Sequence, residues 1–173
     1  MKKILRHLLL LLLIATAASS ADAQVVKGQK TFGVHGGYVT RNRSGVAGID
    51  FEYTFSKHFR LAPSVDYIFS NRGSDGFMFN IDYHGPYPLN SAGTFNVYHV
   101  IGLNYASWHN KVYHNEGDPD ADVSTRDNRF GFDFGAGLEY YVQPTMKLSF
   151  EGKFNWLRHY NTGLFYFGIS YVF

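Results

Sequence analysis

Beyond about residue 30, the chain alternates between apolar and polar or small side chains at almost every step. In the stretch IDFEYTF (residues 49–55), isoleucine, phenylalanine and tyrosine alternate with two carboxylates and a threonine. A period of two is the period of a β-strand whose two faces meet different surroundings. No apolar run of helical length occurs in this part of the sequence. The pattern therefore predicts an all-β chain.

Turn-forming residues divide the alternating pattern into eight predicted strands. The predicted strands cover residues 31–40, 46–55, 59–70, 77–87, 94–108, 129–142, 146–158 and 164–173. Every second connection is short (SKH, PLNSAG and QPT), whereas the other set includes the long polar stretch 109–128. Short turns at one end and longer loops at the other are typical of outer-membrane barrels.

The two faces of the predicted strands differ sharply in chemistry. One face is apolar or aromatic, and His99 is its only readily ionisable residue. The opposite face carries His35, Asp50, Glu52, Arg60, Asp66, Asp82, His84, Asp133, Glu139, Lys147, Glu151 and Lys153. A soluble sandwich or lipocalin-like barrel would bury the apolar face. A transmembrane barrel would turn it toward lipid and enclose the charges.

Strand length and composition favour the transmembrane alternative. The predicted strands have about 10 residues, the length that a tilted transmembrane strand needs. The chain contains 16 Phe and 13 Tyr, too many rings for the inside of a small soluble barrel. Because lipid offers the backbone no hydrogen bonds, the sheet must close on itself. We therefore predict an eight-stranded antiparallel up-and-down transmembrane β-barrel in the bacterial outer membrane.

The N-terminal segment predicts export. It has a basic start, an apolar run over residues 8–18 and an Ala21-Asp22-Ala23 cleavage pattern, which is typical of a secretory signal peptide. We predict a cleaved signal peptide over residues 1–23 and a barrel domain over residues 24–173. The chain has no cysteine, so neither a lipoprotein anchor nor a disulfide is expected.

The charge of the predicted mature domain excludes one class of partner. Without Lys2, Lys3, Arg6 and Asp22, 13 basic and 13 acidic residues remain, and the net charge is zero. This balance gives no electrostatic support for a nucleic-acid partner. No cofactor is predicted.

The last strand carries the most specific family likeness. Its outward row is Phe167, Ile169, Tyr171 and Phe173. With the signal peptide and eight strands, this ending resembles the small outer-membrane barrels of the OmpX and OmpA type. The stretch NVYHVIGLNYASW (residues 96–108) is similar to barrel proteins of Bacteroidota. The resemblance implies a monomer surrounded by outer-membrane lipid and lipopolysaccharide, with the last strand as the signal read by the barrel-assembly machinery.

The charged face predicts a filled interior. An eight-stranded barrel has room for little more than its own side chains. Buried charges are tolerable when they form a connected network. We predict such a network from Asp50, Glu52, Arg60, Asp66, Asp82, Asp133, Glu139, Lys147, Glu151 and Lys153. A narrow porin-like channel is the alternative.

Two stretches raise the question of metal binding or catalysis. In the polar stretch 109–128, the carboxylates Asp118, Asp120 and Asp122 are spaced as at the start of a calcium loop. Val123 and Arg129 then stand where that motif requires glycine and glutamate, so no metal site is predicted. LRHYNTG (residues 157–163) resembles the His-x-Ser neighbourhood of outer-membrane lipid A deacylases.

The deacylase resemblance makes His159 the candidate catalytic residue. Asn161 stands at the expected serine position, however, and Thr162 is displaced by one residue. The competing interpretation is a polar hairpin loop, and we predict that the protein is not an enzyme. Trp108 and Trp156 fall near the outer ends of their strands and are predicted as anchors at the membrane interface, with packing against the loops as the alternative.

The predicted function is that of an integral outer-membrane barrel with a structural role or an interaction role through its surface loops. A lipid A-modifying enzyme and a narrow pore are the alternatives, and a soluble lipid carrier is the weakest.

Overall fold

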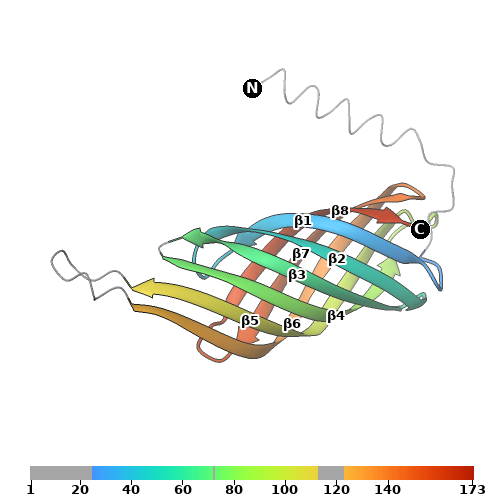
Figure 1. The fold of residues 1–173 in the computed structure, drawn as a ribbon. Helices are drawn as coiled ribbons and strands as arrows, with labels where there is room; N and C mark the ends of the chain where they lie inside the picture. The colour runs from blue at the N-terminus through green and yellow to red at the C-terminus, as the bar shows by residue number, and fades with distance from the viewer. Residues whose placement is uncertain (1–24, 72, 113–122) are drawn as a thin grey trace, which may run out of the picture.

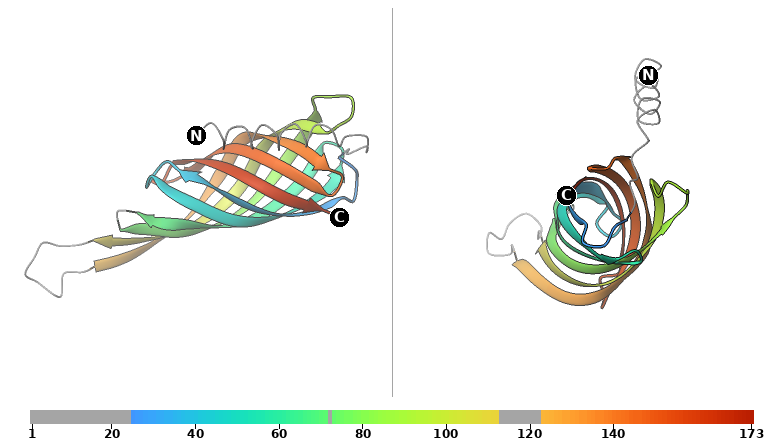
Figure 2. Two further views of the ribbon diagram at one scale, coloured as in Figure 1. Left: turned by 90° about the horizontal axis from the view of Figure 1, so that it is seen from above. Right: turned by 90° about the vertical axis from the view of Figure 1, so that its right-hand side faces the viewer.

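The protein folds into a closed barrel of eight antiparallel strands (Figure 1). The computed structural model describes residues 25–71, 73–112 and 123–173. The strands follow one another around the barrel in sequence order, and β8 pairs with β1 to complete the wall (Figure 2). The predicted fold class is confirmed. The predicted signal peptide and the three carboxylates of the calcium-like spacing lie outside the described residues.

The strand bounds are β1 Lys30–Val39, β2 Ser44–Ser56, β3 Phe59–Asn71, β4 Ser74–Pro88, β5 Phe95–Val112, β6 Val123–Gln143, β7 Met146–Leu157 and β8 Thr162–Val172. They differ most from the prediction at the end of β5 and the start of β6. There, part of the predicted loop is strand, because Lys111 pairs with Ser124 and Val112 with Val123. These residues lie beyond the apolar belt, where alternation no longer signals a strand. Within the described ranges, no helix has the length and apolar character needed to cross a membrane.

The barrel has two distinct ends. The turn end holds the C-terminus and the connections β2–β3, β4–β5 and β6–β7, which comprise residues 57–58, 89–94 and 144–145. The loop end holds the other four connections. At the loop end the tips of β5 and β6 extend beyond the other strands (Figure 1), and β5 stays paired with β4 up to Asn110. β6 pairs with β7 only from Gly131 onward, whereas it pairs with β5 from Val123.

The barrel is apolar outside and charged inside. Along β8, Phe167, Ile169 and Tyr171 are exposed, whereas Tyr166 and Ser170 are buried. The same alternation continues around the wall. The buried charged residues are Glu52, Arg60, Asp66, Asp82, Asp133, Glu139, Lys147 and Lys153. This polarity is opposite to that of a soluble protein and matches a wall in contact with hydrocarbon.

The lumen is not uniformly polar, and the sequence analysis did not identify its apolar part. At the loop end, an apolar layer fills the lumen. It consists of Val39, Val46, Ile68, Met78, Ala106, Trp108, Leu157, Leu164 and Tyr166. These residues lie on the same strand faces as the charged residues. In β5, Trp108 follows the buried Asn104 by four positions, which puts both side chains on the inner face.

The two tryptophans therefore occupy opposite environments. Trp108 is 1% exposed inside the lumen, so its prediction as an interface anchor was wrong. It packs in the apolar layer under Tyr160 of the β7–β8 connection, with the ring centroids 6.1 Å apart. Trp156 is 63% exposed on the outer surface, as an interface residue would be.

Quenching by lipid tests this inside-out arrangement directly. In vesicles of brominated phospholipid, we expect strong fluorescence quenching in Trp108→Phe, which retains only Trp156. We expect little quenching in Trp156→Phe, because its remaining indole is shielded from the acyl chains. Unbrominated vesicles are the control. Equal quenching of the two variants would contradict the arrangement.

Candidate functional site

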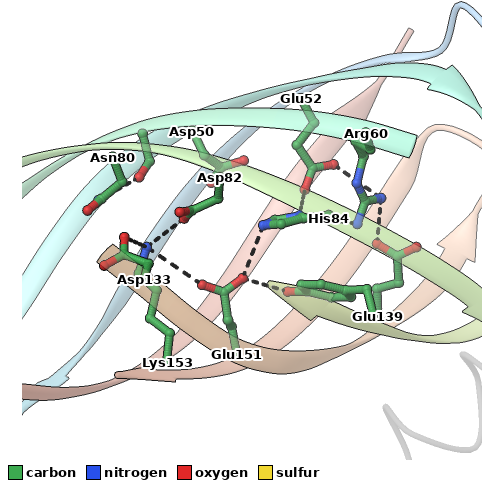
Figure 3. A network of polar contacts seen from close by, with 12 residues as sticks. Asp50, Glu52, Arg60, Asn80, Asp82, His84, Asp133, Glu139, Glu151 and Lys153 are labelled. Atoms are coloured by element: carbon green, nitrogen blue, oxygen red, sulfur yellow. Dashed lines mark hydrogen bonds and ion pairs between the residues drawn. The ribbon is translucent and has the colours of Figure 1, made fainter. Parts of the chain in front are cut away.

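Charged side chains from several strands meet in the lumen of the barrel (Figure 3). The ten predicted interior residues come from β2, β3, β4, β6 and β7. Eight of them are buried, and Asp50 and Glu151 are half-buried. They form three clusters along the barrel axis, to which β1 and β4 add His35 and His84.

The first cluster, the balanced quartet, contains two cations and two carboxylates. The Arg60 guanidinium Nη1 lies 2.8 Å from Glu139 Oε2 and 3.5 Å from Glu52 Oε2. Lys147 Nζ lies 3.2 Å from the same Glu139 oxygen and also donates a hydrogen bond to Glu52. Asn96 Nδ2 donates to the second Glu139 oxygen at 3.3 Å. Each buried charge in the quartet therefore has an opposite charge beside it.

The second cluster, the Lys153 group, joins one ammonium to three carboxylates. Lys153 Nζ lies 2.7 Å from Asp82 Oδ2, 3.6 Å from Asp133 Oδ2 and 4.0 Å from Glu151 Oε1. Asn104 donates a hydrogen bond to Asp133. Unlike the balanced quartet, this group contains more carboxylates than cations.

The third cluster, the His35 bridge, spans β1, β2 and β3. The His35 ring lies between two carboxylates, with Nδ1 3.0 Å from Asp50 Oδ1 and Nε2 2.5 Å from Asp66 Oδ1. Asn80 and Tyr166 both donate to Asp66 Oδ2, at 2.8 and 3.1 Å. A ring that contacts a carboxylate through each nitrogen is suited to the protonated, cationic form.

Glycines on neighbouring strands make room for these side chains. A Cβ atom at Gly33 would lie 2.7 Å from both carboxylate oxygens of Asp50. A Cβ at Gly102 would collide with Asp82 Oδ1. These carboxylate oxygens therefore occupy the space that a Cβ atom would need, so the two glycines are part of the packing of the lumen.

A small cavity remains between the clusters. It has a volume of about 40 Å³, and its lining includes His35, Asp50, Asp82, His84, Glu151 and Lys153. Several buried polar atoms have no hydrogen-bond partner among the described residues, including Asp82 Oδ1, His84 Nε2 and Asp133 Oδ2. Unpaired buried polar atoms beside a polar cavity indicate ordered water.

Within the described ranges, the structure does not pair the imidazole of the candidate catalytic residue His159 with a hydroxyl. His159 is exposed in the β7–β8 connection, in a left-handed conformation with φ of 65°. Its carbonyl accepts a hydrogen bond from Arg41 Nη1 at 3.1 Å. Thr162 Oγ1 lies 3.2 Å from the Arg41 backbone nitrogen, which donates to it, and 3.5 Å from Thr40 Oγ1. Asn161 Oδ1 accepts from the Leu157 backbone nitrogen at 3.1 Å. These contacts are those of a hairpin turn.

The described ends of the predicted polar stretch form local contacts. His109 Nδ1 lies 3.2 Å from Asp75 Oδ1. Asp127 accepts hydrogen bonds from the Tyr160 hydroxyl at 2.5 Å and from Arg129 at 3.0 Å. The bond to Asp127 raises the pKa of Tyr160 above its usual range, so this hydroxyl remains a donor. In the part of the chain that the structure describes, no three acidic or histidine side chains are grouped to hold a metal ion.

The C-terminal row named from the sequence lies on the outer surface of β8. Phe167, Ile169, Tyr171 and Phe173 are all exposed, and the Phe173 backbone exchanges hydrogen bonds with Lys30 at the start of β1. The last strand therefore closes the barrel while its outward side chains remain accessible.

A family model and several solved structures resemble this chain. The model described as outer membrane protein beta-barrel domain matches residues 8–173. The N-terminal β-barrel domain of Pseudomonas aeruginosa OprF is 15% identical with a TM-score of 0.67, over 85% of this chain and 98% of that one. No curated protein matches the sequence.

Two further structures have the same architecture. Ail, the attachment invasion locus protein of Yersinia pestis, is 13% identical with a TM-score of 0.61, over 86% of this chain and all of its own (100%). A major outer membrane protein of Thermus thermophilus is 12% identical with a TM-score of 0.65, over 84% and 99% of the two chains. At these identities the likeness is one of fold.

Removing one cation from the balanced quartet tests its role in stability. Arg60→Met leaves Glu52 and Glu139 with a single ammonium, and we expect a loss of about 3–5 kcal/mol in the free energy of unfolding. The double variant Arg60→Met, Glu139→Gln restores the balance and should recover much of that loss. Urea unfolding of the refolded barrel, followed by electrophoretic mobility without boiling, measures both.

Arg158→Met is the matched control, because its side chain is exposed at the loop end. It should unfold like the wild type. If the single and double Arg60 variants were equally unstable, charge balance would not be what holds the quartet together.

Proposed function

The chain belongs to the family of outer membrane protein beta-barrel domains, and from this premise we propose that it is a sealed barrel of the bacterial outer membrane with a structural and surface-interaction role. The proposal rests on one observation, the filled lumen. Transport would need a continuous aqueous path, whereas a structural barrel needs only a stable wall.

Two different layers fill the lumen. At the loop end, the apolar layer around Trp108 excludes water from the cross-section, and most of its side chains are 0–2% exposed. Toward the turn end, the charged clusters occupy the remaining space with ion pairs that cross the barrel. The cavity of about 40 Å³ has room for a few water molecules and not for a sugar or another organic solute. This arrangement supports the filled interior over the narrow channel.

The surface role is supported by arginines in the described part of the loop end. The described residues there include five arginines, namely Arg41, Arg43, Arg126, Arg129 and Arg158. Described carboxylates at this end are Asp75 and Asp127, and Asp127 already pairs with Arg129. Guanidinium groups bind phosphate through two parallel hydrogen bonds. We infer that these five arginines, which we call the arginine rim, contact the phosphorylated sugars of lipopolysaccharide. Ail, which has the same architecture, was also solved in complex with the heparin analogue sucrose octasulfate, a polyanion.

The outward row of β8 supports a second contact, made during assembly. Phe167, Ile169, Tyr171 and Phe173 present a continuous aromatic and aliphatic row on the strand that closes the barrel against β1. We infer that the barrel-assembly machinery reads this row and that the closed product is a monomer.

The role that we propose includes no catalysis. The deacylase alternative requires a hydroxyl beside the imidazole of His159. The nearby hydroxyl of Thr162 instead binds the β1–β2 connection, and Asn161 is used to close the turn. The contacts of Asn161 and Thr162 are therefore explained by the hairpin turn between β7 and β8.

Conductance separates the sealed barrel from a channel. In planar bilayers, we expect the refolded protein to give no steady current, because neither lumen layer leaves a water path. A general porin refolded in the same way is the positive control. A stable open state, or swelling of protein-containing liposomes in sugar solutions, would contradict a sealed lumen.

Removing positive charge from either end of the barrel tests whether the arginine rim binds lipopolysaccharide. The triple variant Arg43→Gln, Arg126→Gln, Arg158→Gln should bind dispersed lipopolysaccharide more weakly than the wild type, with a shallower dependence on salt. The matched control is Lys27→Gln, Lys30→Gln, Lys57→Gln, which removes the same charge at the turn end. Surface plasmon resonance of nanodisc-embedded protein measures both. An equal loss in the two triples would argue against a specific rim.

A further inference from the structure

The lumen contains more negative than positive side chains. Among the described residues, seven carboxylates face inward, namely Asp50, Glu52, Asp66, Asp82, Asp133, Glu139 and Glu151. Three permanent cations, Arg60, Lys147 and Lys153, oppose them. Protonated His35 adds a fourth positive charge. With all seven carboxylates ionised, three negative charges then remain uncompensated in a space shielded from bulk water.

His84 does not reduce this excess. Arg60 Nη2 lies 3.5 Å from His84 Nδ1 and can only donate, so Nδ1 is the acceptor and the ring is neutral. The proton of the neutral ring is then on Nε2. That atom is 3.7 Å from Glu151 Oε2, too far for a hydrogen bond.

The excess is concentrated around the cavity. The balanced quartet is neutral within itself, whereas the His35 bridge carries one surplus negative charge and the Lys153 group carries two. Asp50, Asp82 and Glu151, from these two clusters, all line the cavity, together with the hydroxyl-bearing Ser64 and Ser149. The side chains of Asp50 and Glu151 retain 19% and 13% of their exposure, so their carboxylates are the ones that a small occupant can reach.

An independent feature points to an occupant in the same place. His84 is 5% exposed, lines the cavity and directs an Nε2 donor that has no acceptor among the described residues. Figure 3 shows its ring between Glu52 and Glu151. A water molecule in the cavity would accept this hydrogen bond and could present its second lone pair to a cation.

We propose that the cavity binds a hydrated monovalent alkali cation, Na⁺ or K⁺, between Asp50 and Glu151. Burial of uncompensated carboxylates is costly, and a small cation offsets that cost where the protein supplies no further side-chain cation. The size of about 40 Å³ admits an alkali ion with one or two waters. A tight divalent site would need several protein oxygens around the ion, and the described residues contain no such group.

Cation substitution at constant ionic strength tests the site. We would measure the thermal unfolding midpoint in uncharged detergent with the chlorides of sodium, potassium and N-methyl-D-glucamine. The organic cation screens charge equally but is too large for the cavity. The wild type should unfold a few degrees higher in sodium or potassium, with a dependence that saturates.

Variants locate the effect. Asp50→Asn keeps a hydrogen-bond acceptor for His35 and removes one surplus negative charge. Most of the difference in unfolding midpoint between the salts should therefore vanish. Glu151→Gln serves the same purpose if the first variant folds poorly. Asp75→Asn, which removes a carboxylate outside the cavity, should retain the difference. Thallium soaked into crystals should give an anomalous peak between Asp50 and Glu151.

Several results would overturn the proposal. Identical midpoints in the three salts would do so, as would a sodium effect that survives in both cavity variants or a thallium peak elsewhere. If the thermal unfolding midpoint responded to acid but not to the choice of cation, protons would be what neutralises the lumen carboxylates. That result would also exclude the bound ion.

Discussion

Hydrocarbon offers the peptide backbone no hydrogen-bond partner, and the rest of the structure follows from that constraint. Every strand must find neighbours on both sides within the membrane, so the sheet closes through β1 and β8. Closure also fixes what faces outward. The outer wall is made of phenylalanine, tyrosine and branched aliphatic side chains, and the charged residues remain on the inner face.

Confinement in a narrow cylinder makes the charged residues depend on one another. The ion pairs cross the lumen and join strands that are far apart in the sequence. Arg60 pairs with Glu139 over 79 positions and Lys153 with Asp82 over 71. Such pairs form only in the native register, because a one-residue slip would turn each member toward lipid. The network thus contributes to the choice of register as well as to stability.

The sequence was sufficient to predict the strands of the barrel wall, but it was less informative about the contacts inside the lumen. Alternation predicted the eight strands and their outward faces, because lipid imposes one simple rule on every outer position. Which carboxylate meets which cation depends on strand register and tilt, and alternation carries neither. Trp108 was misassigned because the prediction relied on its position near a strand end. Its place on the same strand face as Asn104 points to the lumen instead. The ends of β5 and β6 were missed because, beyond the membrane, backbone pairing continues without any apolar signal.

The unpaired edge at the start of β6 has an evolutionary consequence. From Val123 to Asn128, β6 is hydrogen-bonded to β5 and is not paired with β7, whose register begins at Gly131. Substitutions along this edge of β6, other than at Asp127, which accepts a hydrogen bond from Tyr160, leave the closed circuit of strands intact. Substitutions there can therefore alter the displayed surface while the cylinder that carries it keeps its strand pairing.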